Sequence, residues 1–180
     1  MPSLHRLILL RHAKSSWKDT SLPDDERPLA RRGRRALPVV AKYLRGTGLT
    51  VELVLCSPAQ RTRQTLDGVR VGLRGEPEVR IVREIYEATA DELLEILHQV
   101  EGRYGSVLLI GHNPGMEELV DDLVSGGDEG ALTRLREGFP TAALATLSSD
   151  LDWADLSWRG ARLDSFVRPR DLSPRSTPRT

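Results

Sequence analysis

The chain has 180 residues, of which 39% are hydrophobic and 29% charged, a composition typical of one soluble globular domain. Its 26 basic and 26 acidic residues give a formal net charge of zero, which excludes a global electrostatic attraction to nucleic acid or to a membrane. The single cysteine, Cys56, excludes an internal disulfide and indicates a reducing compartment. Because no apolar run reaches about 18 residues, no transmembrane helix is expected, and the protein is predicted to be cytoplasmic.

Strands and helices are expected to alternate along the chain. Continuous apolar runs predict buried strands over residues 4–10, 51–56, 79–82, 106–110, 142–147 and 162–167. Helices are expected from residue 29 to about 45, from 57 to about 71, from 89 to about 100 and from 113 to about 124. Ser57-Pro58 and Asn113-Pro114 each pair an N-cap residue with a first-turn proline, and Thr89 to Glu92 has the spacing of a capping box. Pro38 is expected at a kink or near a helix end.

This alternation argues for an α/β sandwich with a mostly parallel central sheet. In such a sheet, ligands bind beyond the carboxyl ends of the strands. Residues 125–130 are expected to form a glycine-rich loop. We expect a single domain over residues 1–168 and a disordered tail over residues 169–180, where proline, serine, threonine and arginine dominate.

Polar residues follow two of the buried strands directly. Arg11 and His12 end the first apolar run, and His112 comes just after the run at residues 106–110. Arg61 lies about one turn into the helix that Ser57-Pro58 is expected to begin, where the helix N-terminus already favours an anion. The pattern predicts an anion site at the strand ends, with guanidinium groups that bind phosphate in a bidentate way.

The same residues predict phosphoryl chemistry without a metal. A neutral His12 imidazole is a capable nucleophile toward phosphorus. Arg11, Arg61 and His112 could neutralise the equatorial oxygens of the transferring group. Glu84 and Glu87, which follow the strand at residues 79–82, are the best-placed candidates for the proton donor to the leaving group.

Other chemistries fit the sequence poorly. No His-x-His, His-Glu-x-x-His or Cys-x-x-Cys spacing occurs, so neither a metal site nor another cofactor is expected. Cys56 precedes the Ser-Pro signal, which could lower a thiol pKa. However, Cys56 and Arg61 are one residue closer than a cysteine-based phosphatase loop requires, which argues against a cysteine nucleophile.

Three motifs together resemble the histidine phosphatase superfamily, in the branch that includes phosphoglycerate mutases. They are Leu9 to Trp17 (LLRHAKSSW), Cys56 to Thr65 (CSPAQRTRQT) and Gly111 to Gly115 (GHNPG). The resemblance is closest to the small SixA-type phosphohistidine phosphatases, and it implies a three-layer, phosphoglycerate mutase-like sandwich. It also implies that His12 is the phosphorylated nucleophile, that Arg11, Arg61 and His112 form the phosphate pocket, and that Glu84 is the proton donor.

The sequence therefore predicts a phosphatase with a phosphohistidine intermediate. Its expected partner is a phosphorylated substrate. The chain lacks the long insertions that cover the site in mutases, and an open site would suit a phosphohistidine displayed on another protein. One alternative is a small-molecule phosphomonoesterase or a mutase-like enzyme. An alternative of another class is a non-catalytic protein that binds a phosphorylated ligand. Nucleic acid and membrane partners are not expected.

Overall fold

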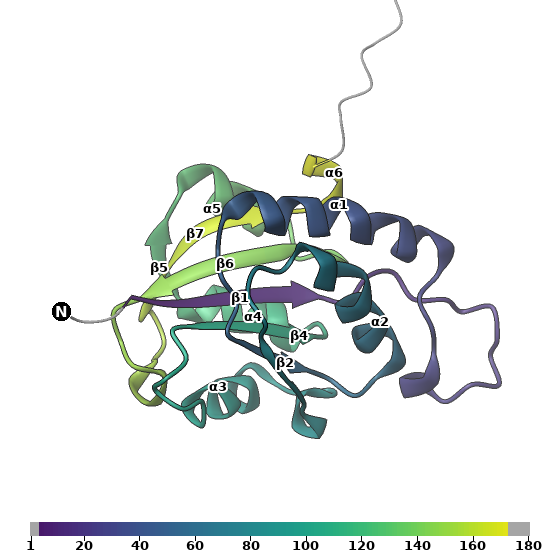
Figure 1. Ribbon diagram of the computed structural model, residues 1–180, viewed down its shortest axis with the longest axis horizontal. Coiled ribbons are helices and arrows are strands. Elements are labelled where there is room, and N and C mark those ends of the chain that lie inside the picture. The colour runs from purple at the N-terminus through teal and green to yellow at the C-terminus, as the bar shows by residue number, and fades with distance from the viewer. Residues whose placement is uncertain (1–3, 173–180) are drawn as a thin grey trace, which may run out of the picture.

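A computed structural model describes residues 4–172, and Figure 1 shows one twisted sheet with helices on both faces. The strands are β1 (His5–Arg11), β2 (Leu53–Cys56), β3 (Glu78–Ile81), β4 (Ser106–Gly111), β5 (Val124–Gly127), β6 (Leu144–Ser149) and β7 (Ala161–Val167). The α-helices are α1 (Arg31–Thr47), α2 (Gln60–Val69), α3 (Ala90–His98), α4 (Gly115–Leu123), α5 (Glu129–Arg136) and α6 (Pro169–Leu172). Single turns of 3-10 helix are η1 (Asp24–Glu26), η2 (Arg70–Gly72), η3 (Arg83–Ile85) and η4 (Trp153–Asp155).

The sheet has the strand order β3-β2-β4-β1-β6-β7-β5. The four strands from β3 to β1 pair in parallel, as do β5 and β7. Among the strands of the described residues, β6 alone pairs in the antiparallel sense, with β1 on one side and β7 on the other. The predicted α/β fold with a mostly parallel central sheet is therefore confirmed.

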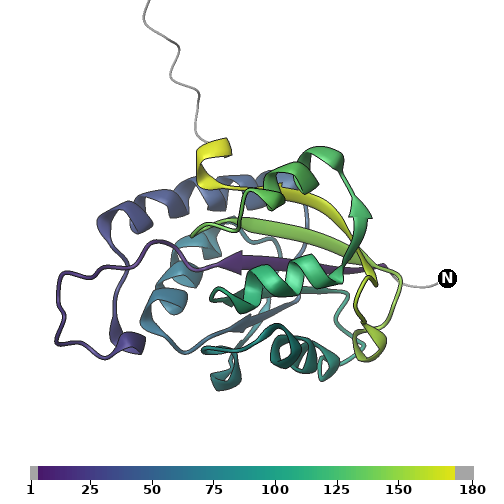
Figure 2. The ribbon, with the colours of Figure 1, turned by 180° about the vertical axis from the view of Figure 1, so that it is seen from behind.

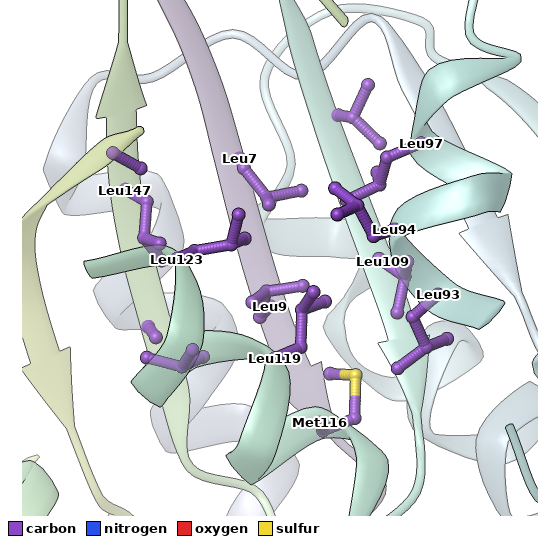
Figure 3. Packing of buried hydrophobic residues seen from close by; sticks show 14 of the residues in the cluster. Leu7, Leu9, Leu93, Leu94, Leu97, Leu109, Met116, Leu119, Leu123 and Leu147 are labelled. Carbon is purple, nitrogen blue, oxygen red and sulfur yellow. The ribbon is translucent and has the colours of Figure 1, made fainter. Parts of the chain in front are cut away.

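Each face of the sheet carries its own hydrophobic core. Ile8 and Leu10 of β1 belong to the cluster beneath α1 and α2, on the side that Figure 1 shows in front. Leu7 and Leu9 point the other way, into the cluster beneath α3, α4 and α5, which Figure 2 shows from behind. In Figure 3, leucines of α3 and α4 surround Leu9 and Leu109. Because both faces are covered, the central strands read as continuous apolar runs rather than as alternating ones.

Two helices begin later than their N-cap signals predict. Helix α2 begins at Gln60 rather than after Ser57, and α4 begins at Gly115 rather than after Asn113. Neither Ser57 nor Asn113 is the N-cap residue, since Ala59 and Pro114 occupy that position. Ser57 contacts His112, and the Asn113 amide donates to Glu117. The capping box that opens α3 at Thr89 is present as predicted.

Three further points concern Pro38, the glycine-rich segment and the tail. Pro38 lies inside α1, which continues on both sides of it. The loop expected at residues 125–130 is wrong, because β5 and the start of α5 occupy it, with Asp128 as an N-cap that accepts from the amide of Ala131. Residues 169–172 of the predicted tail form α6, which packs beside α1 (Figure 1), while residues 173–180 lie outside the described residues.

None of the helices within residues 4–172 combines the length and the apolar character that a membrane span requires.

Candidate active site

The candidate site lies where β1, β2 and β4 end at the same edge of the sheet. Arg11 is opposite Gly111 in the parallel register of β1 and β4. The backbone continues this register, because the amide of His12 donates to the carbonyl of Gly111 at 3.1 Å. The amide of Ser57, after β2, donates to the carbonyl of Ile110 at 3.1 Å. The residues that follow the three strands therefore meet at one edge.

His12 is held with one ring nitrogen free for chemistry. Its side chain is buried, and Nδ1 lies 2.7 Å from the carbonyl oxygen of Ala13. A carbonyl can only accept, so Nδ1 carries the proton of the neutral ring and the lone pair is on Nε2. Burial lowers the pKa of His12 to about 4, and the charges of Arg61 and Arg11 contribute to this shift. His12 is therefore a neutral imidazole at physiological pH.

His112 lies beside His12, with the two ring centroids 5.2 Å apart. Its Nε2 lies 2.7 Å from the hydroxyl oxygen of Ser57, and the edge of Tyr86 packs on its ring at 5.4 Å between centroids. Burial, followed by the neighbouring His12 and Arg61, lowers the pKa of His112 to about 3. Ser57 thus fixes the orientation of a second neutral imidazole.

Two arginines complete what we call the strand-end cluster: Arg11, His12, Arg61 and His112. Arg61 is buried in the first turn of α2. Arg11 donates from Nη1 to the carbonyl of Phe139 at 2.8 Å. Three buried nitrogen atoms of the cluster have no hydrogen-bond partner within the described residues, namely Nε of Arg11, Nε of Arg61 and Nδ1 of His112. Buried donors without partners are costly, so their gathering at one edge fits an anion that would satisfy them.

Within residues 4–172, one carboxylate contacts the cluster, and it belongs to Asp24 of η1. Arg61 donates to its backbone carbonyl at 2.6 Å and to Oδ2 at 2.9 Å. Tyr86 donates its hydroxyl to the same Oδ2 at 2.6 Å, and Arg27 donates to Oδ1 at 3.0 Å. The hydrogen bond from Tyr86 and the two guanidinium groups hold the pKa of Asp24 well below its usual range. Sequence reasoning missed Asp24, because nothing in the polar loop at residues 14–28 marks it.

Glu84 and Glu87 are placed differently. Glu84 is exposed on η3 and lines a separate surface hollow with Arg80 and Gln99. Within residues 4–172, no hydrogen bond or ion pair joins Glu84 to the strand-end cluster, and the same holds for the exposed Glu87. The structure thus brings together the four cluster residues that the sequence predicted, but not the predicted carboxylates.

Two other expectations concern Cys56 and metals. Cys56 is buried in β2, and burial raises the pKa of its thiol to about 12, so the sulfur stays protonated. Within the described part of the chain, no three histidine, cysteine, aspartate or glutamate side chains are grouped so that they could hold a metal ion.

Comparisons with known proteins agree with this geometry. The sequence profile of the Histidine phosphatase superfamily (branch 1) matches residues 7–101, which contain His12, Arg61 and the first two motifs. The chain belongs to the histidine phosphatase superfamily. An uncharacterized protein of Mycobacterium tuberculosis is 35% identical over 163 residues, which cover 89% of this chain and all of that protein.

Two SixA proteins are also similar to this histidine phosphatase. The structure of a protein from Nakamurella multipartitia, provisionally assigned as a phosphohistidine phosphatase SixA, has 33% identity and a TM-score of 0.80. The matched region covers 92% of this chain and 96% of the Nakamurella chain. The phosphohistidine phosphatase SixA of Escherichia coli is 28% identical over 147 residues, covering 81% of this chain and 86% of that protein. The family and these neighbours identify the protein as a phosphatase with a phosphoglycerate mutase-like fold.

Proposed function

We propose that this phosphatase acts through a phosphohistidine intermediate on His12, and that its substrate is phosphohistidine displayed on another protein. The proposed intermediate on His12 rests on one observation, the protonation state of the His12 ring. It is neutral because it is buried, and its Nε2 lone pair is free because Nδ1 donates to the carbonyl of Ala13.

In the first step, Nε2 of His12 attacks phosphorus in line as the bond from phosphorus to the leaving group breaks. Arg11, Arg61 and His112 bind the equatorial oxygens, on which charge is spread during the transfer. The unpartnered nitrogens of these three residues support this assignment, since an anion would satisfy donors that are otherwise unpaired.

We assign the proton donor to Asp24 rather than to Glu84. Asp24 contacts Arg61 directly, whereas Glu84 faces a separate hollow. In the free enzyme Asp24 is ionised, because Tyr86 and Arg61 stabilise the carboxylate. A phosphate dianion bound to Arg61 would compete for that guanidinium and add negative charge, which raises the pKa of Asp24 and allows it to carry a proton.

In the second step, water attacks the phosphorus of phosphohistidine. The P–N bond breaks, the electron pair returns to Nε2 of His12, and the ionised Asp24 accepts the proton from water. Inorganic phosphate then leaves, and Asp24, protonated at the end of this step, releases to solvent the proton that it took up when the substrate bound, so both residues return to their starting protonation states. The cycle uses the same carboxylate first as an acid and then as a base.

Two observations support phosphohistidine as the substrate. The Escherichia coli relative is a phosphohistidine phosphatase, and it aligns over most of both chains. Imidazole is a good leaving group once protonated, so it suits a site whose only contacting carboxylate, among the described residues, is the half-exposed Asp24. For its location we propose the cytoplasm, because the buried, protonated Cys56 suits a reducing compartment.

A substrate panel tests the proposal. The purified enzyme is given a phosphohistidine peptide, several sugar phosphates and phosphoglycerates, and kcat/KM is measured for each. We expect the phosphohistidine peptide to have the highest value. A higher kcat/KM for a sugar phosphate or a phosphoglycerate would instead establish the small-molecule phosphomonoesterase or mutase-like alternative. No turnover of any substrate, with phosphate still raising the melting temperature, would establish the non-catalytic alternative.

A further inference from the structure

A cavity of about 440 Å³ lies next to the strand-end cluster, between the first turn of α1, the turn after α5 and the segment that leads into α6. We call it the side cavity. Its volume is in the range of pockets that hold small organic groups. Ala36, Phe139, Pro140 and Ala142 contribute its apolar wall. None of the residues that we assign to phosphoryl transfer, apart from Arg11, lines it.

Arg11 connects the side cavity to the cluster. It lines the cavity, and it is the last residue of β1, immediately before His12. The carbonyl of Phe139 accepts from Nη1 of Arg11 at 2.8 Å and from the Asn113 amide at 3.0 Å. Asn113, which also lines the cavity, directly follows His112. A substrate whose phosphate is bound by Arg11 could therefore place a neighbouring group in the side cavity.

The lining of the side cavity is strongly basic. Five basic and two acidic side chains surround it. Arg168 and Arg170 are neutralised in ion pairs with Glu137, and Arg168 also pairs with Asp171. In contrast, Lys14 and Arg32 have no ion-pair partner among residues 4–172 and are exposed. These two uncompensated cations give the cavity its net attraction for an anion.

The backbone holds these two cations next to each other. The amide of Ala30 donates to the carbonyl of Lys14 at 2.8 Å, just before α1 begins. Gly33, in the first turn of α1, lies so close to this segment that a Cβ there would be 2.2 Å from the same carbonyl oxygen. Only glycine permits this approach, which places Arg32 beside Lys14 on the cavity wall.

We propose that the side cavity binds a second anionic group, a carboxylate or another phosphate, of the phosphorylated substrate, with Lys14 and Arg32 as its ligands. This inference rests on the proposed phosphatase activity and names the charge class of its substrate. A second anion could belong to an acidic side chain near a phosphohistidine on a protein or to a small phosphorylated acid. Both sources present the same chemistry to the cavity.

A matched pair of substrates tests the proposal. Phenyl phosphate and 3-carboxyphenyl phosphate differ by one carboxylate, and the ratio of their kcat/KM values reports recognition of that group. For the wild-type enzyme we expect a roughly three- to tenfold preference for the carboxylated substrate, mostly through a lower KM, decreasing with added salt. Arg32→Gln and Lys14→Gln should each reduce this ratio at least twofold. Arg35→Gln, at an exposed position of α1 outside the cavity lining, is the matched control and should leave the ratio unchanged.

The outcomes separate this proposal from the proposed function. Turnover of phenyl phosphate with no preference for the carboxylated substrate would overturn the anionic subsite but not the phosphatase activity. The anionic subsite would also be overturned if Arg35→Gln reduced the preference for the carboxylated substrate as much as Arg32→Gln does. The preference would then depend only on general surface charge. If neither aryl phosphate is turned over, the ratio is measured with phosphohistidine peptides instead, and no hydrolysis of those peptides would overturn both proposals. The same ratio for phosphohistidine peptides with aspartate or asparagine beside the histidine identifies the source, because only a protein substrate predicts that preference.

Discussion

His12 and His112 face each other at the ends of neighbouring strands, with 5.2 Å between ring centroids and 56° between ring planes. Each ring has one nitrogen in a hydrogen bond, to Ala13 and to Ser57 respectively. Burial and the flanking arginines disfavour a positive charge on either ring. The site therefore favours a ligand that brings negative charge, which would offset the flanking arginines and leave the Nε2 lone pair of His12 free to attack phosphorus.

This relationship predicts a stability that depends on pH. The pKa values of His12 and His112 are lowered from 6.5 to about 4 and about 3, so the unfolded chain binds protons that the folded protein does not. Stability is thus fully present above pH 6.5 and decreases by several kcal/mol as the pH falls toward 4, since each pKa unit corresponds to about 1.4 kcal/mol per group. Urea unfolding at several pH values measures this loss. The variant with both His12→Asn and His112→Asn should lose clearly less over the same range, and an equal loss would contradict the assignment.

Arg61→Lys should weaken phosphate binding although the positive charge is kept. Lysine cannot reproduce the planar fork of donors with which Arg61 now contacts the carbonyl and carboxylate of Asp24. We expect the Kd for inorganic phosphate, measured by calorimetry, to rise about tenfold. Arg63→Lys is the control, since Arg63 is exposed on the same helix and should bind phosphate as the wild type does. Equal Kd values for all three proteins would exclude Arg61 from the phosphate site.

Asp24→Asn should show its effect through the leaving group. If Asp24 donates the proton, hydrolysis of an alkyl phosphate should slow by about 100-fold. Hydrolysis of p-nitrophenyl phosphate, whose leaving group needs little protonation, should change far less. Asp25→Asn, in the same exposed turn, and Glu84→Gln should leave both rates near wild type. If Glu84→Gln instead produced the leaving-group dependence, the proton donor would be Glu84.

Ser57→Ala should impair catalysis more than folding. The hydroxyl of Ser57 contacts Nε2 of His112 at 2.7 Å, and its loss leaves that ring without a partner to fix its orientation. We expect kcat/KM for p-nitrophenyl phosphate to fall about tenfold, while the free energy of unfolding falls by only about 1 kcal/mol. An unchanged kcat/KM would show that Ser57 does not position His112.

The strand ends could be predicted from sequence because both faces of the central strands are covered. Leu7 to Leu10 alternate between two cores, so the whole run is apolar and its end at Arg11 is sharply defined. Parallel pairing then brings the residues after each strand to one edge, so the proximity of His12 and His112 follows from the order of strands and polar residues along the chain.

The carboxylate and the helix starts could not be predicted in the same way. Asp24 reaches Arg61 from a loop whose path depends on tertiary contacts, such as the hydrogen bond from Tyr86. The Ser57 hydroxyl can cap a helix or bond to a distant histidine, and local sequence does not decide between the two uses. β5 was missed because it is a short edge strand with two glycines, and so it lacks the apolar pattern of the central strands.

The central claim, that His12 carries the phosphoryl group, is tested most directly by trapping the phosphoenzyme. The enzyme is mixed with a radiolabelled phosphohistidine peptide, quenched in alkali within milliseconds, and digested to locate the label. We predict an acid-labile, alkali-stable phosphoramidate on the peptide that contains His12, and no label in a folded His12→Asn variant. Label on any other residue, or full turnover by His12→Asn, would contradict the account.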